Sequence, residues 1–173
     1  NKTRHTDLVP VVGVHIEPFG AYSTKIKDLK DLPDGASVAI PNDPVNTGRA
    51  LVLLHEAGLI KLKDPSNTLA TQRDIAENPK KLKIRELEGA LLARAVNQVD
   101  LAFVFANYAL EAGIDTNSAL IVEKGKDLYV EYLVARPDNL QDPGIQKLAK
   151  ALNTPEVRNF ILTRYKGQIA PGF

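Results

Sequence analysis

Four polar residues, Glu17, Asn46, Arg49 and Asn107, could together bind a zwitterion, because each is expected on a strand or just beyond the end of one. The guanidinium of Arg49 is a planar, two-pronged donor suited to a carboxylate. A carboxylate and amide oxygens suit an ammonium group. The alternative for Arg49 is a helix residue whose charge is solvated. This set of residue types predicts a receptor for a small molecule that carries both charges.

A strand–loop–helix unit over residues 37–58 is expected to position Asn46 and Arg49. Residues 37–40 are apolar and β-branched, which predicts a buried strand, and two prolines end it. The pattern becomes helical from Gly48, with Arg49 in the first turn, and a glycine at the far end favours a stop. Ligands bind at the carboxyl ends of strands in open α/β sheets, and a helix N-terminus there favours an anion.

Strand and helix patterns alternate along the rest of the chain, which favours an α/β protein with a mainly parallel sheet. Asn107 stands just past one expected strand. The expected strands cover residues 8–14, 59–62, 82–85, 101–105 and 128–135, and the expected helices cover 72–77, 88–97 and 108–112, with two more beginning at Asp142–Pro143 and Thr154–Pro155.

The composition gives no strong electrostatic preference. The 173 residues carry a net charge of +1, from 22 basic and 21 acidic side chains, so no bias toward nucleic acid or membranes is indicated. The densest basic run, at residues 80–85, is flanked by glutamates, which predicts a solvated face. Cysteine is absent, which excludes disulfides and thiol catalysis.

The motifs of common enzyme classes are missing. There is no G-x-S-x-G, no G-x-G-x-x-G and no phosphate-loop sequence. His5, His15 and His55 lack metal-ligand spacing. His15 and Glu17 lie where the strand expected over residues 8–14 ends or bends. Residues two apart on a strand share a face, so the pair could simply form a satisfied polar contact. We therefore predict no catalytic residue, no metal site and no cofactor.

The run Val-Ala-Ile-Pro-Asn-Asp-Pro-Val-Asn-Thr-Gly-Arg at residues 38–49 resembles a signature of the methionine-binding lipoprotein family. These proteins are the substrate-binding components of bacterial methionine ABC importers. The resemblance extends over residues 58–64 and 74–84, and over shorter segments at 86–88, 107–109 and 165–167. It implies an α/β, bilobal periplasmic-binding-protein fold of the two-crossover type, whose two lobes close on the ligand by a hinge motion.

The resemblance also implies a domain organisation. Family members carry a lipid-modified cysteine and a further segment before the point where this sequence starts. On that basis residues 1–28 are expected to be a partial lobe one. Residues 29–118 would form a complete lobe two, and residues 119–173 would add the C-terminal part of lobe one, including the second crossover.

Ligand-binding roles follow residue by residue from the resemblance. Arg49 matches the arginine for the ligand carboxylate, and Asn107 matches an asparagine that holds the ligand backbone. Asn46 lies within the signature itself. Glu131 occupies a third polar position, where relatives commonly have asparagine; it would favour the ligand ammonium, or else face solvent. Glu17 lies on the first crossover strand, where relatives vary between aromatic and acidic residues.

The function implied is that of a solute-binding protein that captures a small amino acid, above all methionine, for an ABC importer, without enzymatic activity. Alternatives are a binder or sensor of another zwitterion, such as a short peptide, and an enzyme on the same fold. The expected partners are methionine or a related amino acid and an ABC transporter permease, but not nucleic acid. The membrane would be reached only through a lipid anchor absent from this chain. The expected location is the cell envelope, in the periplasm or at the outer face of the cytoplasmic membrane.

Overall fold

The computed structural model describes residues 5–123 and 129–173. The chain divides into two compact units. Unit 1 combines Asn1–Pro18 with Lys124–Phe173, and unit 2 is Phe19–Glu123. The lobe boundaries expected from the sequence, after residues 28 and 118, stay a prediction.

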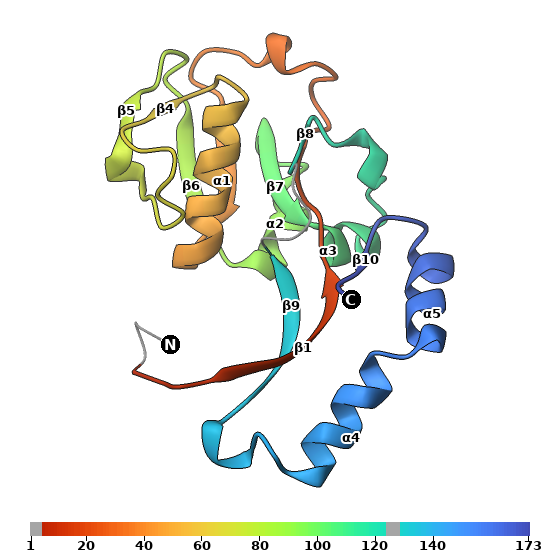
Figure 1. Cartoon of the computed structure of the whole chain (residues 1–173). Helices are drawn as coiled ribbons and strands as arrows, with labels where there is room; N and C mark the ends of the chain where they lie inside the picture. Colours follow the sequence, from red (N-terminus) through yellow and green to blue (C-terminus); the bar gives the residue numbers. More distant parts are fainter. Residues whose placement is uncertain (1–4, 124–128) are drawn as a thin grey trace. The chain divides into compact units, whose positions relative to one another are not determined.

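Unit 2 is built on a five-stranded sheet in the order β6-β3-β7-β2-β8 (Figure 1). The central strand β7 pairs parallel with β3 and antiparallel with β2, while β6 is parallel to β3 and β8 is antiparallel to β2. The strands are β2 (Phe19–Tyr22), β3 (Ser37–Pro41), β6 (Lys83–Leu87), β7 (Leu101–Phe105) and β8 (Ile121–Val122).

The prediction of a mainly parallel sheet is wrong, because two of the four strand pairs are antiparallel. Strand β2 is followed by an irregular segment and the 3-10 turn η2 (Leu29–Asp31) before β3 begins, rather than by a helical crossover. A helical crossover is what makes successive strands parallel, so the alternation of patterns gives no direction for β2 or β8.

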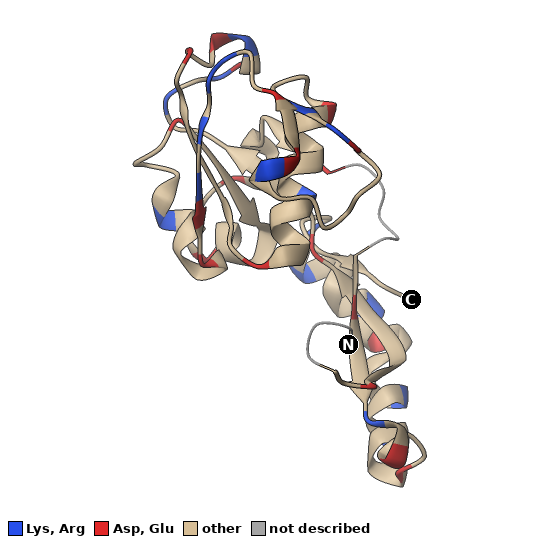
Figure 2. Ribbon diagram, turned by 90° about the vertical axis from the view of Figure 1, so that its left-hand side faces the viewer, with Lys and Arg blue, Asp and Glu red and all other residues tan. Residues whose placement is uncertain are grey.

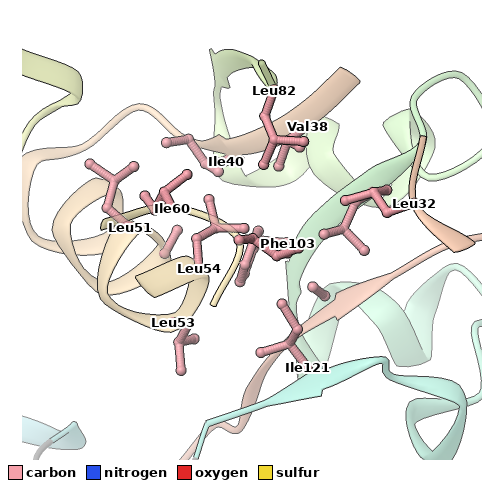
Figure 3. Close-up of a cluster of buried hydrophobic side chains, with 14 of the residues drawn as sticks. Leu32, Val38, Ile40, Leu51, Leu53, Leu54, Ile60, Leu82, Phe103 and Ile121 are labelled. Carbon is pink, nitrogen blue, oxygen red and sulfur yellow. The ribbon is translucent and has the colours of Figure 1, made fainter. Parts of the chain in front are cut away.

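Helices cover both faces of this sheet. Helix α1 (Pro44–Glu56) and helix α2 (Gly89–Ala95) pack on opposite sides of the central strands. Figure 3 shows Val38, Ile40 and Phe103 of the sheet meeting Leu51 and Leu54 of α1. Because side chains alternate along a strand, the residues between them point to the α2 face. Those are Ala39, Ala102 and Val104, which cluster with Leu92 and Val96.

The smaller elements of unit 2 complete its surface. The sequence predicts a helix over residues 72–77, but only Gln72–Asp74 forms a 3-10 turn, η3. Residues Ile75–Glu77 are strand β5, which pairs with β4 (Lys61–Leu62). The capping box of Thr71 and Asp74 does form, so the predicted start of the helix is confirmed, but its predicted length is wrong. The remaining elements are helix α3 (Ala106–Glu111) and the 3-10 turn η4 (Thr116–Ser118).

Unit 1 has a three-stranded antiparallel sheet in the order β10-β1-β9. The long strand β1 (Val9–Ile16) lies between β9 (Val130–Ala135) and β10 (Ala170–Pro171). Leu128, the first residue of the strand predicted over residues 128–135, lies outside the described residues. Helices α4 (Pro143–Leu152) and α5 (Pro155–Tyr165) begin where the sequence predicts, and the 3-10 turn η5 (Pro137–Asn139) precedes them.

Basic and acidic residues are interspersed along the described part of the chain (Figure 2). In the basic run, Lys81, Lys83 and Arg85 are exposed, in agreement with the predicted solvated face. Lys80 is the exception, because its ammonium donates to the backbone carbonyl of Leu32 at 2.6 Å. One lysine of the run therefore ties the loop before β6 to the loop before β3.

Candidate ligand-binding site

The helix that carries Arg49 begins earlier than the sequence predicts. Its N-cap is Asp43, whose carboxylate accepts from the backbone N–H of Asn46 at 3.0 Å, and Pro44 occupies the first helical position. A proline is favourable there because that position needs no donor. Arg49 consequently lies in the second turn of α1, and its predicted place in the first turn is wrong. The positive end of the helix therefore faces Asp43 rather than Arg49.

Arg49 is buried, with 6% of its surface exposed, so the alternative of a solvated helix residue is also wrong. Its guanidinium carbon lies 5.0 Å from the ring centroid of Phe19 and 5.9 Å from that of Phe105. The two rings stack on each other with centroids 4.6 Å apart. Such cation–π contacts strengthen when they are shielded from water, so the aromatic pair favours a charged arginine here.

The carboxylate of Glu123 binds the guanidinium side-on. Arg49 Nε donates to Glu123 Oε1 at 2.6 Å, and Arg49 Nη2 donates to Glu123 Oε2. Arginine and glutamate therefore form a two-pronged ion pair, with only 12% of the glutamate side chain exposed. The two residues are 74 positions apart, and no local pattern in the sequence links them.

Asn46 lies beside Arg49 on the same helix. Its amide nitrogen donates to both carboxylate oxygens of Asp43, at 3.1 and 3.0 Å. The amide oxygen is thereby turned toward Arg49, whose Nη1 donates to it at 3.5 Å. The structure thus brings two of the predicted site residues, Asn46 and Arg49, into contact.

Asn107 lies at the same edge of the sheet. It is the second residue of α3, immediately after β7, and β7 runs parallel to the strand that leads into α1. Phe105, two residues before it, contacts the guanidinium of Arg49. The side-chain oxygen of Asn107 accepts from the backbone N–H of Tyr108 at 2.7 Å. This bond fixes the direction of the amide.

Glu17 and Glu131 belong to unit 1, where both lie near His15. His15 Nε2 is 3.2 Å from Glu17 Oε1, so the polar contact expected between them is present. Glu131 is directly opposite His15 in the register of β1 and β9, and it is exposed. The hydrogen bond that the ring of His15 donates to the carboxylate of Glu17 raises the pKa of His15; burial opposes this shift, and the charges of Glu17 and Glu131 support it.

Sequence reasoning missed three residues that contact Arg49. Glu123, Phe19 and Phe105 come from three separate strands or strand ends, and they meet only in the folded sheet. A buried arginine requires a partner for its charge, so the burial of Arg49 indicates that a carboxylate lies beside it. It gave no indication of which of the 21 acidic residues would supply it.

The described residues contain no group of three or more histidine, aspartate or glutamate side chains arranged to hold a metal ion. None of the helices described has the length and apolar character needed to cross a membrane.

The whole chain matches a known family. The family described as NlpA lipoprotein matches residues 1–173. The chain belongs to the NlpA lipoprotein family. The resemblance to methionine-binding lipoproteins predicted from the sequence is thereby confirmed.

Relatives within the NlpA lipoprotein family give this placement more detail. The chain is 44% identical over 167 residues to a probable D-methionine-binding lipoprotein MetQ of Pasteurella multocida, covering 96% of the chain and 60% of that relative. It is 42% identical to outer membrane lipoprotein 2 of Mannheimia haemolytica, covering 99% of the chain and 63% of that relative. The chain thus spans about three fifths of the length of these curated relatives.

Solved structures share the fold. A nutrient-binding protein from Burkholderia cenocepacia bound to methionine is 44% identical, with a TM-score of 0.94 over 99% of this chain and 73% of that one. The substrate-binding protein of a methionine transporter from Streptococcus pneumoniae is 35% identical, with a TM-score of 0.94 over 100% of this chain and 71% of that one. The predicted periplasmic-binding-protein fold is confirmed.

Proposed function

We propose that this chain is part of a solute-binding protein that captures a small zwitterionic amino acid, methionine above others, for an ABC importer. The observation that carries the proposal is the 44% identity, over 99% of the chain, to a protein solved with methionine bound. The protein would act by binding and release alone, with no bond made or broken, and would deliver the ligand to a membrane permease.

The proposed roles follow from charge. Arg49 takes the ligand carboxylate, supported by Asn46. Asn107 holds the ligand backbone, and Glu17 and Glu131 attract the ammonium. A buried arginine with a fixed plane suits this role, because the cost of ordering it is met on folding rather than on binding.

The lobe assignment and the location are also part of the proposal. Residues 29–118 would be lobe two, and residues 1–28 and 119–173 would belong to lobe one. The relatives named as lipoproteins support a place in the cell envelope, with the protein in the periplasm or at the outer face of the cytoplasmic membrane.

A second candidate ligand is another zwitterion, such as a short peptide. The observation that favours it is Glu131, an acid where the family resemblance leads us to expect asparagine. An added carboxylate strengthens attraction to an ammonium and repels a carboxylate placed nearby. It could therefore suit a ligand whose two charges lie further apart than those of an amino acid.

Titration calorimetry with L-methionine tests the proposal, with competition by other amino acids and by short peptides. Arg49→Ala should weaken methionine binding by roughly tenfold to a hundredfold, because a charge-assisted pair is lost. Arg85→Ala is a matched control, since Arg85 is an exposed arginine of the same unit. Unchanged affinity in Arg49→Ala would contradict the assignment. Consumption of a ligand in a turnover assay would instead favour an enzyme.

A further inference from the structure

Unit 2 contains a cavity of about 460 Å³ that no part of the proposed function uses. It lies where the end of strand β2, the end of helix α2, the turn after helix α3 and the 3-10 turn η4 come together (Figure 1). Every residue that lines it belongs to unit 2. Small-molecule sites usually have volumes of roughly 300–1,000 Å³, so this cavity is large enough for a ligand.

The cavity lies on the opposite face of the sheet from Arg49. Tyr22, which lines the cavity, belongs to the apolar cluster on the α2 face. Phe19, whose ring contacts the guanidinium of Arg49, belongs to the cluster on the α1 face and stands at the other end of β2. A molecule in the cavity is therefore separated from the candidate ligand-binding site by the sheet itself.

Four residues that line the cavity carry hydrogen-bond donors with no acceptor among residues 5–123 and 129–173. They are Tyr22, Ser23, Arg94 and Asn97. Tyr22 is only 4% exposed, so its hydroxyl has little access to water and favours an acceptor placed in the cavity. The oxygen of Ser23 accepts from two backbone N–H groups, at 3.0 and 3.2 Å, which leaves its own hydrogen available.

Arg94 supplies a positive charge. It lies in the last turn of α2, it is exposed, and no carboxylate pairs with it in the described part of the chain. Burial, together with the charge of Asp115, raises the pKa of Tyr22, so the phenol stays protonated and can donate at neutral pH. The carboxylate of Asp115 already accepts from the backbone N–H and the amide of Asn117, at 2.9 and 3.0 Å. The lining is therefore rich in donors and includes one cation.

This set of donors fits a phosphate ester. Arginine binds a phosphate group with two parallel N–H groups. A phosphate ester offers three strong acceptor oxygens, one more than a carboxylate, so the hydroxyls and the amide can find acceptors as well. The cavity is also much larger than one phosphate group, which leaves space for the organic part of the ester.

We propose that this cavity is a binding site for a small phosphate ester, in which Arg94 binds the phosphate and Tyr22, Ser23 and Asn97 donate to its remaining oxygens. The inference does not depend on the proposed function, because none of these four residues has a role in it. A free phosphate ester and the headgroup of a phospholipid share this chemistry, and the experiment separates the two sources.

The first arm of the test is calorimetry with sn-glycerol 3-phosphate on the wild-type protein and three variants. We expect saturable binding with a dissociation constant of about 0.1–1 mM, weakened about tenfold or more in Arg94→Ala by the loss of the charge-assisted bonds. Tyr22→Phe keeps the buried ring and removes only the hydroxyl, so it should weaken binding by about threefold to tenfold. Arg85→Ala is the matched control, because Arg85 is an exposed arginine of unit 2 that does not line the cavity.

The second arm measures flotation with vesicles of phosphatidylglycerol or of phosphatidylcholine, for the wild-type protein and Arg94→Ala. Flotation with phosphatidylglycerol that Arg94→Ala abolishes would assign the site to a lipid headgroup. Binding of glycerol phosphate without flotation would assign it to a free ester. Either result supports the proposal, provided that the loss is specific to Arg94→Ala and absent in Arg85→Ala.

Three outcomes would overturn the inference. The first is that neither probe binds, with no saturation by glycerol phosphate up to about 10 mM, ten times the weakest dissociation constant expected. The second is equal weakening in Arg94→Ala and Arg85→Ala, which would mean attraction to surface charge in general. The third is succinate binding as tightly as glycerol phosphate, which would exclude a phosphate-specific site. If Tyr22→Phe does not fold, Arg94→Ala decides, because Arg94 is exposed.

Discussion

Asp100, just before β7, is hydrogen-bonded to Ser37, the first residue of β3. Its Oδ2 accepts hydrogen bonds from both the backbone N–H and the hydroxyl of Ser37, each at 2.7 Å, and its Oδ1 accepts from Lys25 Nζ at 3.0 Å. The hydrogen bonds from Ser37, aided by Lys25, lower the pKa of Asp100 to about 2. The parallel strands that lead to Arg49 and Asn107 are therefore joined at their amino ends by one carboxylate.

Asp100→Asn should lower the free energy of unfolding at pH 7 by about 2 kcal/mol. A pKa near 3.9 in the unfolded chain and about 2 in the folded protein correspond to at most about 2.5 kcal/mol, and solvent screening of this partly exposed carboxylate reduces that figure. Because the folded-state pKa is the lower one, the stabilisation is present above about pH 4 and is lost as the pH falls toward about 2. Urea unfolding at several pH values measures it.

The control for this prediction is Asp34→Asn, since Asp34 is an exposed aspartate in the turn before β3. Its effect should be within about 0.5 kcal/mol of zero. A destabilisation of Asp100→Asn that stays constant down to pH 2 would show that the charge of Asp100 is not what stabilises the protein.

Gly48→Ala should destabilise the protein, although alanine is the better helix former. A Cβ at Gly48 would lie 2.2 Å from the carbonyl oxygen of Thr68 and 3.1 Å from the backbone nitrogen of Ala70. Neither backbone atom can move without shifting the loop that covers α1. We expect a loss of roughly 1–3 kcal/mol from overpacking, against a gain of about 1 kcal/mol in helix propensity, so the net effect is destabilising.

Gly89→Ala is the matched control for Gly48→Ala. Gly89 is also helical, but its added Cβ would meet side-chain atoms of Phe105 and Tyr108 at 3.6 Å, which is ordinary contact. Denaturant midpoints should therefore fall for Gly48→Ala and hold or rise for Gly89→Ala. Equal stabilisation by both substitutions would mean that the loop at Thr68 can shift with little loss of folding free energy.

The local elements were largely predictable because their signals are local. Strand β7 occupies the predicted residues 101–105, since a short apolar run between polar flanks has few other interpretations. The two C-terminal helices begin at Pro143 and Pro155, each preceded by a side chain that caps the first turn. Such signals act within three or four residues, so a single sequence contains them in full.

The site was less predictable because its contacts are not local. The start of α1 was misplaced because Pro44 reads as a turn signal as well as a helix start. Phe19, Phe105 and Glu123 meet Arg49 only through the order and direction of the strands. The alternation of patterns gave no strand order, and the mainly parallel sheet that it predicted is wrong. The roles of Glu17, Asn46, Arg49, Asn107 and Glu131 in ligand binding stay predictions.

The pKa of His15 should lie above its ordinary value and return toward it in Glu17→Gln. The bond at 3.2 Å favours the protonated ring, as does the charge of Glu131 on the facing strand. Because the folded-state pKa is the raised one, this pair contributes stability that is present below about pH 6.5 and is lost as the pH rises through the folded-state pKa. Titration of the ring signals by NMR measures the shift.

Glu156→Gln is the control for the His15 titration, because Glu156 is an exposed glutamate of the same unit. It should leave the pKa of His15 where it is in the wild-type protein. Should Glu17→Gln have equally little effect, the contact between His15 and Glu17 would not be the cause of the shift.

N-acetyl-L-methionine should bind much more weakly than L-methionine if Glu131 and Asn107 hold the ligand ammonium. The acetylated compound keeps the carboxylate and the side chain but loses the charge and two donors. A hydrogen bond to a charged group contributes about 1.5–3 kcal/mol, so the two dissociation constants should differ by roughly tenfold to a hundredfold or more.

Glu131→Gln should reduce that difference, because the variant loses the attraction for the charge that acetylation removes. The substitution should weaken methionine binding while leaving N-acetyl-methionine binding within about threefold of wild type, the scale of a contact that contributes little. Glu156→Gln again serves as the control. Glu131 is exposed and faces His15 across the strand pair, so a purely solvent-facing role remains the competing explanation. Equal binding of the two ligands by the wild-type protein, measured by calorimetry, would decide for that explanation.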